Sequence, residues 1–164
     1  MFRFVAGRRR YSFEMRAVVQ RVSKAVVTVE GRVTGSIEGG LLVLVGVAAD
    51  DTEEDLAWLA VKIVQQKLFA DATGRMNWSV TESGGGILVV SQFTLLASTR
   101  KGTKPSWHRA AGPEVAVPLY ERFVRKMEEL LGRPVATGEF GAMMEVELVN
   151  DGPVTLVLDS RWRE

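Results

Sequence analysis

The alternation of apolar and polar residues in the first third of the chain predicts β-structure. Apolar residues alternate with polar ones over residues 15–22 and 25–37, which is typical of strands with one buried face. Glu30-Gly31 lies between alternating runs and predicts a hairpin turn. The segment LLVLVGVA, residues 41–48, is continuously apolar, as a strand buried on both faces would be.

The pattern then changes to a helical period. Residues 50–69 carry apolar side chains at helical spacing, namely Leu56, Leu59, Ala60 and Ile63. Asp51 with Glu54 resembles a capping box, and further acids fill the first turn. These features predict a helix that buries one face.

Residues 112–134 predict a second helix. Four apolar residues share one face: Leu119, Phe123, Met127 and Leu130. Gly132 and Pro134 end the segment. A proline costs a helix one hydrogen bond, so we expect the regular part to begin at Pro118.

Strand-like segments cover most of the remaining chain. Residues 84–98 predict a strand, and residues 146–160 predict two strand segments separated by Gly152-Pro153. The order of strands, helix, strand, helix and strands indicates a single domain of mixed α/β class.

Composition narrows the classes of protein that fit. A chain of 164 residues with 46% hydrophobic content suits one domain with a substantial core. No apolar run approaches the roughly 20 residues that span a bilayer, so we expect no membrane association. The absence of Cys fits a reducing, cytoplasmic location, and a single His with no Cys argues against a zinc site. We expect no metal and no cofactor.

Charge is unevenly distributed, although the net charge is only +1. Residues 1–14 hold four arginines and one acid, so we expect a basic N-terminal extension over 1–14 and a folded domain over 15–164. The body is not a generic binder of polyanions. Residues 83–113 contain no acid but several cations; charge alone favours an ordinary solvated loop over a local anion site.

Polar residues interrupt the apolar strand pattern at Ser91, Gln92 and Thr94. Buried polar atoms need partners, so this stretch is either a site or the polar face of a half-exposed strand. Alternation along a strand would place Gln92 and Thr94 on one side, and Ser91 and Phe93 on the other.

Two further segments carry candidate chemistry. Basic residues, glycine, proline and an aromatic in residues 99–114 suit contacts with phosphates and bases, from Arg100, Lys101, Lys104 and Trp107. Gly152-Pro153 is either a simple turn or a cis peptide, which only proline makes cheaply. The chain has no G-x-S-x-G elbow, P-loop or G-x-G-x-x-G motif. A Ser–His–acid triad would have to use His108.

Four motifs together resemble the D-aminoacyl-tRNA deacylase family, also called D-tyrosyl-tRNA deacylases. They are MRAVVQRVSKAVVTVEG, SQFTL, KGTKPSWHRAA and FGAMMEVELVNDGPVT, in this order. The resemblance covers residues 15 to about 161 and leaves 1–14 without a counterpart. Lys104 stands where the family usually has Arg, and Trp107 where it usually has Phe; the first change keeps a charge but loses a bidentate fork.

The resemblance implies a fold, an activity and a partner. The fold would have mixed or antiparallel sheets in a barrel-like β/β/α layered arrangement with two main helices. The family hydrolyses the ester between a D-amino acid, or glycine, and the terminal adenosine of tRNA. It forms homodimers with each active site at the interface. We therefore expect the 3′ end of aminoacyl-tRNA and a second copy of the chain as partners.

The resemblance also implies site residues. Ser91, Gln92, Phe93 and Thr94 would line the catalytic pocket, with the Phe93 and Thr94 N–H groups holding the substrate carbonyl. A cis Gly152-Pro153 would reach into the partner's site and exclude L side chains, and Arg21 would support it. Residues 140–143 would neighbour the adenosine or the aminoacyl group, or belong to the core.

Three interpretations of function therefore remain open. Beside the deacylase, the chain could be a non-catalytic RNA-binding module, although plain RNA binding needs no chiral filter. It could also be another hydrolase, with Thr94 or Ser91 as nucleophile and His108 as base. Within the deacylase, water could be activated by Thr94 or with the help of the 2′-hydroxyl of the terminal ribose; the second is preferred because no general base is evident near Thr94.

Overall fold

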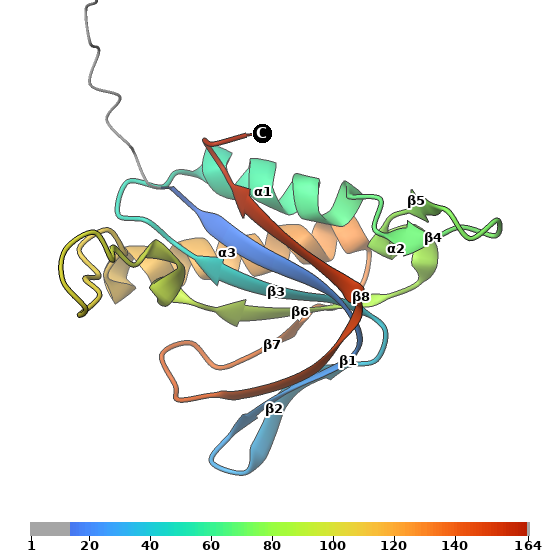
Figure 1. Ribbon diagram of the computed structural model, residues 1–164, viewed down its shortest axis with the longest axis horizontal. Helices are drawn as coiled ribbons and strands as arrows, with labels where there is room; N and C mark the ends of the chain where they lie inside the picture. The colour runs from blue at the N-terminus through green and yellow to red at the C-terminus, as the bar shows by residue number, and fades with distance from the viewer. Residues whose placement is uncertain (1–13, 164) are drawn as a thin grey trace, which may run out of the picture.

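Two long, bent strands, β1 (Arg16–Val29) and β8 (Glu145–Asp159), pair along their length in the computed structural model, which describes residues 14–163 (Figure 1). The expected basic extension lies outside these residues except for Glu14. The other strands are β2 (Arg32–Ile37), β3 (Gly40–Gly46), β4 (Phe69–Ala70), β5 (Met76–Trp78), β6 (Gly86–Ser91) and β7 (Ala136–Thr137). The helices are α1 (Glu53–Gln65), α2 (Val80–Ser83), α3 (Pro113–Leu131) and the 3-10 turn η1 (Phe93–Leu96). Among the described residues, no helix is long and apolar enough to cross a membrane.

The main sheet is mixed and curls toward a barrel. Its order is β2-β1-β3-β6-β7, and β8 pairs with the other edge of β1. Strands β3, β6 and β7 are parallel, whereas β1 pairs with β2, β3 and β8 in antiparallel fashion. Helices α1 and α3 cover one face of the sheet, and the bent halves of β1 and β8 curve with β2 and β7 around the other (Figure 1). The predicted α/β, barrel-like layered fold with two main helices is confirmed.

The central strands separate two apolar cores. Leu41 and Val43 of β3 face the core beneath the helices, which also contains Phe123. Leu42 of β3 and Leu88 of β6 face a second core inside the curled sheet. Burial on both faces explains why the run 41–48 is continuously apolar. The helix residues predicted to be buried, such as Leu59, lie in the core, except Leu130, which is only partly buried against it.

Gly35 allows β2 to pass directly against β7. A Cβ atom at this position would lie 2.3 Å from the Thr137 carbonyl oxygen and 3.0 Å from a methyl carbon of Leu88. Any larger residue would push the two strands apart, so this glycine permits the sheet to close over its inner core.

Several sequence-based boundaries were wrong. The strand predicted over 84–98 ends at Ser91 and is followed by η1. The capping box of α1 uses Thr52 and Asp55 rather than Asp51 and Glu54. Helix α3 begins at Pro113, so Pro118 lies inside it.

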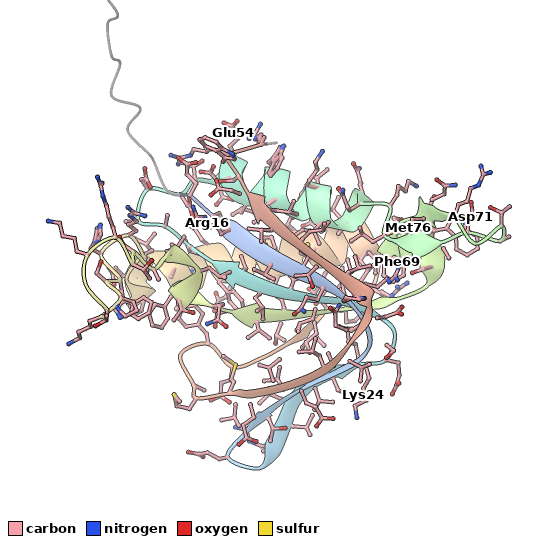
Figure 2. The ribbon with its side chains drawn as sticks, in the orientation of Figure 1. Arg16, Lys24, Glu54, Phe69, Asp71 and Met76 are labelled. Atoms are coloured by element: carbon pink, nitrogen blue, oxygen red, sulfur yellow. The ribbon has the colours of Figure 1, made fainter. Side chains whose placement is uncertain are left out.

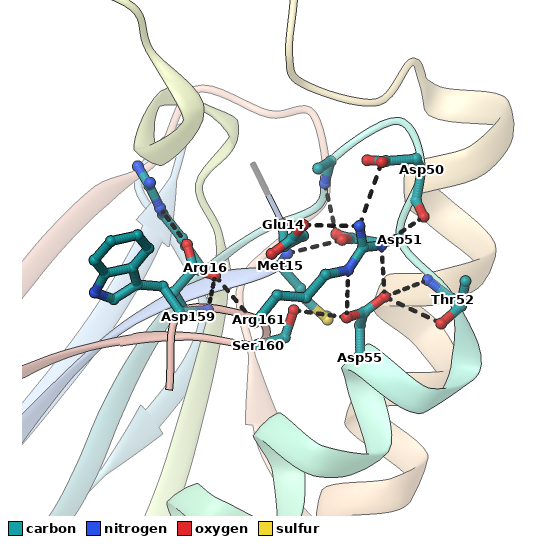
Figure 3. A network of polar contacts seen from close by, with 12 residues as sticks. Glu14, Met15, Arg16, Asp50, Asp51, Thr52, Asp55, Asp159, Ser160 and Arg161 are labelled. Carbon is teal, nitrogen blue, oxygen red and sulfur yellow. Dashed lines mark hydrogen bonds and ion pairs between the residues drawn. The ribbon is translucent and has the colours of Figure 1, made fainter. Parts of the chain in front are cut away.

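Arg161 holds the end of the chain against the start of α1 and β1 (Figure 3). Its guanidinium lies 2.7 Å from Glu14 Oε1, 3.1 Å from Asp55 Oδ2 and 3.4 Å from Asp50 Oδ2. Burial acts to raise the pKa of Asp55, but hydrogen bonds from Arg161, the Thr52 N–H and Ser160 outweigh it and hold the pKa at about 2.

Asp51 lies behind this cluster and has a different role. Its carboxylate accepts the backbone N–H groups of Met15, at 2.8 Å, and Ala48, at 2.7 Å. Burial raises the pKa of Asp51 to about 7 despite these donors. The carboxylate thus joins the residue before β1 to the loop after β3.

Candidate functional site

The SQFT segment forms a turn at the end of β6. The Gln92 N–H donates to the Val45 carbonyl oxygen at 2.7 Å, which continues the pairing of β6 with β3 for one residue. The chain then enters η1, and the Gln92 side-chain amide donates to the Thr94 hydroxyl. Phe93 projects outward and is 54% exposed. The polar residues therefore mark a turn, and the alternation of a strand does not extend past Ser91.

A cavity of about 500 Å³ opens beside this turn. Ser91, Gln92 and Phe93 line it, as do the predicted residues Phe140, Gly141, Ala142 and Met143. Most of the remaining lining is apolar: Val45, Val47, Val90, Ala111, Pro113, Ala116, Tyr120, Met144 and Val146. Thr94 is not among the lining residues. The size and apolar character suit a small, largely apolar moiety such as a base or side chain.

Tyr120 forms part of the cavity wall. Burial raises the pKa of Tyr120 to about 12, so its hydroxyl stays protonated near neutral pH. That hydroxyl donates to the Val89 carbonyl oxygen at 3.3 Å, and the ring lies 5.5 Å from the Phe140 ring. The tyrosine is therefore suited to shape the wall rather than to transfer protons.

A basic loop with an aromatic side chain adjoins η1. Ser98 and Ser106 exchange two backbone hydrogen bonds of 2.9 Å and close the loop between them. Trp107 is 42% exposed, and its ring meets Phe93 edge-on at 5.3 Å. The cations predicted to contact tRNA, Arg100, Lys101 and Lys104, are all exposed.

Arg109 and His108 complete this region. The pKa of Arg109 is lowered by burial and by the nearby charges of Arg16 and Arg100, so positive charge gathers beside η1. His108 shares a 2.9 Å hydrogen bond with the Ser106 hydroxyl and does not line the cavity. This placement does not favour His108 as the base for a nucleophile in the cavity.

Gly152-Pro153 forms an irregularity inside β8, and its peptide bond is cis. The register between β1 and β8 shifts on both sides of Val22, opposite this pair. Asn150 bridges the irregularity, because its side-chain amide donates to the carbonyl oxygens of Arg21, at 2.9 Å, and Val154, at 3.0 Å. Of the two alternatives from the sequence, the structure has the cis peptide.

Arg21 braces this segment from the facing strand. Its Nε lies 3.2 Å from both the carbonyl oxygen and the carboxylate of Asp151, and its Nη1 donates to the Leu68 carbonyl oxygen at 2.6 Å. The side chain is largely buried at this position. The guanidinium therefore connects the residue before Gly152 to the loop after α1.

The structure does not bring Gly152-Pro153 to the cavity of the same chain. Neither residue lines the cavity. Gly152-Pro153 lies near Arg21, while η1 lies near Arg16, which bonds to the Leu95 carbonyl oxygen. Five residues of extended β1 separate these points, or about 17 Å. Both Gly152 and Pro153 are exposed.

Some residues of the cavity were not predicted as site residues. Ala111, Ala116 and Val146 of the cavity are ordinary core residues in the sequence. Asn150 could have been noticed, because an amide beside Gly-Pro can satisfy the backbone groups that an irregularity frees.

The described residues define a single-domain α/β protein with an apolar cavity at the end of a parallel strand. The family model for D-Tyr-tRNA(Tyr) deacylase matches residues 18–159, and the chain belongs to this family.

Known proteins resemble the chain over most of its length. A D-aminoacyl-tRNA deacylase of Opitutus terrae is 64% identical over 150 residues, covering 92% of this chain and all of the relative. One from Bacteroides thetaiotaomicron is 55% identical with the same coverage. The solved structure of a c-Myc DNA unwinding element binding protein has a TM-score of 0.82 and 40% identity, covering 87% of this chain and 97% of that one. A probable eukaryotic D-amino acid tRNA deacylase has a TM-score of 0.77 at 19% identity, covering 88% and 98%, which indicates a shared fold.

Proposed function

We propose that the protein hydrolyses the ester between a D-amino acid, or glycine, and the terminal adenosine of tRNA. The observation that carries this proposal is membership of the deacylase family across residues 18–159. The geometry supports it, because the SQFT turn borders a cavity and Gly152-Pro153 forms a braced irregularity. A plain RNA-binding module would need neither feature.

In this proposal, the cavity receives part of the terminal adenosine or the aminoacyl group. Phe140 and Met143 line this cavity, and the backbone N–H groups of Phe93 and Thr94 hold the substrate carbonyl. Fixed amide donors stabilise the negative charge that develops on that oxygen during hydrolysis. The enzyme contributes placement and electrostatics rather than a covalent nucleophile.

Chiral selection follows from Gly152-Pro153 of a second copy of the chain. Their carbonyl groups would occupy the space that an L side chain needs, whereas hydrogen or a D side chain points away. The separation of about 17 Å within one chain supports an arrangement in which each filter serves the partner's cavity. Exposed Val149 and Val157 on β8 flank the pair and suit burial in a homodimer interface.

The basic loop is proposed to guide the 3′ end of tRNA. Arg100, Lys101 and Lys104 would neutralise phosphates, and Trp107 offers an exposed ring for an unpaired base. The edge-to-face contact with Phe93 places this ring beside the turn that borders the cavity. Substrate would therefore reach the site along the loop.

Removing the Thr94 hydroxyl is expected to leave most of the activity. Its described partner is Gln92, a neutral amide, and Thr94 does not line the cavity, so no base activates it. We expect Thr94→Ala to retain kcat within about tenfold. A substrate ending in 2′-deoxyadenosine should lose at least about a hundredfold in single-turnover rate if the ribose hydroxyl positions water. An inactive Thr94→Ala variant, together with a wild type that cleaves the 2′-deoxy substrate at an undiminished rate, would contradict this mechanism.

The activity itself is tested by measuring release of tyrosine from D-tyrosyl-tRNA and L-tyrosyl-tRNA side by side. The proposal predicts rapid cleavage of the D ester only, with His108→Ala as active as the wild type. Cleavage of neither ester, with tRNA still bound, would replace it with the RNA-binding module. Loss of activity in His108→Ala would favour the hydrolase that uses His108 as its base.

A further inference from the structure

Arg16, the first residue of β1, connects three segments at the edge of the cavity region. Its Nε lies 2.9 Å from Asp159 Oδ2, at the end of β8. Its Nη1 donates to the Leu95 carbonyl oxygen, inside η1, at 3.2 Å. One guanidinium thus ties the last residue of β8 to the turn that carries Phe93 and Thr94. Figure 2 shows Arg16 at the end of the sheet next to this turn.

The turn is held from its other side by backbone contacts. Gly46 of β3 pairs with Arg16, and a Cβ atom at Gly46 would lie 2.8 Å from the Gln92 carbonyl oxygen and 3.3 Å from Leu95 Cβ. The turn is therefore packed against the end of β3 without room to move inward. The Arg16 side chain supplies the polar contact that fixes its Leu95 end.

Asp159 is itself fixed, so it can anchor Arg16. Its Oδ1 accepts the backbone N–H groups of Arg161 and Trp162, both at 3.1 Å, while Oδ2 faces Arg16 (Figure 3). Arg161 continues the connection to the carboxylates of Glu14 and Asp55. The chain end, held by Arg161, thus supports the orientation of Asp159, and Asp159 supports that of Arg16.

We propose that Arg16 is a positioning residue that holds the Phe93–Leu96 turn in the geometry needed for hydrolysis, with Asp159 as its anchor. The inference rests on the proposed deacylase function. Arg16 acts through the turn and does not touch the reacting atoms. A misplacement of about 1 Å by a group remote from the chemistry can lower a rate about a hundredfold, so a single ion pair can matter for kcat while adding little to stability.

The test compares Arg16→Ala, Arg16→Lys and Asp159→Asn with the wild type in steady-state cleavage of D-tyrosyl-tRNA. The amide introduced by Asp159→Asn would keep an oxygen for the two backbone N–H groups and lose only the carboxylate oxygen that Arg16 uses. We expect Arg16→Ala and Asp159→Asn to lower kcat at least about tenfold with KM within about twofold. Arg16→Lys keeps the charge and places its donors on a single nitrogen, so it should recover part of the loss.

Arg122→Ala serves as the control, because Arg122 also pairs with a carboxylate, Glu53, at 2.6 Å and lies on α3. It should leave kcat unchanged, and its thermal midpoint should match that of Arg16→Ala within a few degrees. An active wild type with unchanged kcat in both Arg16→Ala and Asp159→Asn would overturn the inference. A rise in KM at constant kcat would overturn it too, since Arg16 would then be a substrate contact. An inactive wild type would instead refute the proposed function, and this inference with it.

Discussion

Replacing Gly152 with alanine is expected to reduce the preference for D- over L-tyrosyl-tRNA by at least about tenfold. Gly152 has φ +132°, in a region that favours glycine. An added Cβ would lie 2.8 Å from Val154 Cγ2, 2.9 Å from the Val154 nitrogen and 3.2 Å from Arg21 Nη2. The backbone must shift, and the carbonyl groups that exclude an L side chain shift with it. The ratio of kcat/KM for the two esters measures the effect.

Gly74→Ala is the matched control for this substitution. Gly74 also has positive φ, +84°, but a Cβ atom there would meet nothing within 4 Å. It tests a positive-φ glycine replaced by alanine without a steric clash, in the hairpin between β4 and β5. Its D-to-L ratio should equal that of the wild type. If Gly152→Ala kept the wild-type ratio of kcat/KM for the D and L esters, the selection would have to lie elsewhere in the site.

Arg161→Ala is expected to lower the free energy of unfolding by about 2 kcal/mol at neutral pH. Removing one partner of a buried ion pair costs about 3–5 kcal/mol, and we reduce this figure because the Arg161 side chain is 34% exposed. The loss remains substantial because the carboxylates left behind are hidden: the Glu14 and Asp55 side chains are 3% and 5% exposed. Urea unfolding followed by circular dichroism measures the change.

The loss should depend on pH in a defined direction. Arg161 helps to hold the pKa of Asp55 at about 2 in the folded protein, below its unfolded value of about 3.9. The stabilisation of the folded protein by ionised Asp55 is therefore present above about pH 4 and is lost as the pH falls through about 2. Without the hydrogen bonds from Arg161, the pKa of Asp55 lies higher than in the wild type, so the variant takes up this proton at a higher pH and its deficit in unfolding free energy shrinks as the pH falls. Arg122→Ala, which breaks an exposed pair with Glu53, should cost less than about 1 kcal/mol. An equal loss in both variants would contradict the role of the buried cluster.

Local patterns were sufficient for the elements that form cores. The apolar run of β3 predicted a strand buried on both faces, and it lies between two cores. Helical spacing placed Phe123 and Met127 on the buried face of α3. The start of α3 was predicted too late, at Pro118. The missing N–H of Pro118 costs one hydrogen bond but does not interrupt the helix, which begins at Pro113. The short strands β4 and β5 and helix α2 lack enough residues to show a period.

The site depended on contacts between residues far apart in the chain. The sequence predicted a strand through the SQFT segment, because the local pattern around it is apolar. The contacts that form the turn, from Gln92 to Val45 and from Leu95 to Arg16, join positions far apart in the chain and leave no local pattern. Gly152-Pro153 and the SQFT turn were recognised through the family motifs, but their separation in one chain follows only from the register of β1 with β3 and β8. The contacts of Arg16 with Asp159 and Leu95 left no local pattern in the sequence.

Each Gly152-Pro153 pair is proposed to select substrate in the cavity of the partner subunit. This proposal is tested most directly by purifying mixed dimers through two affinity tags. One subunit carries Gly152→Ala, and the other carries Ala142→Trp, which blocks the cavity that Ala142 lines. The open cavity of the first subunit then faces the intact Gly-Pro pair of the second.

The readout is the ratio of D- to L-tyrosyl-tRNA cleavage by the mixed dimer, with each parent homodimer measured beside it. The Ala142→Trp homodimer should be inactive, and the Gly152→Ala homodimer should be poorly selective. We expect the mixed dimer to regain the wild-type ratio, because the two intact parts would meet in one site across the interface. A mixed dimer that keeps the poor selectivity of Gly152→Ala would contradict this proposal, since the pair would then act within its own chain.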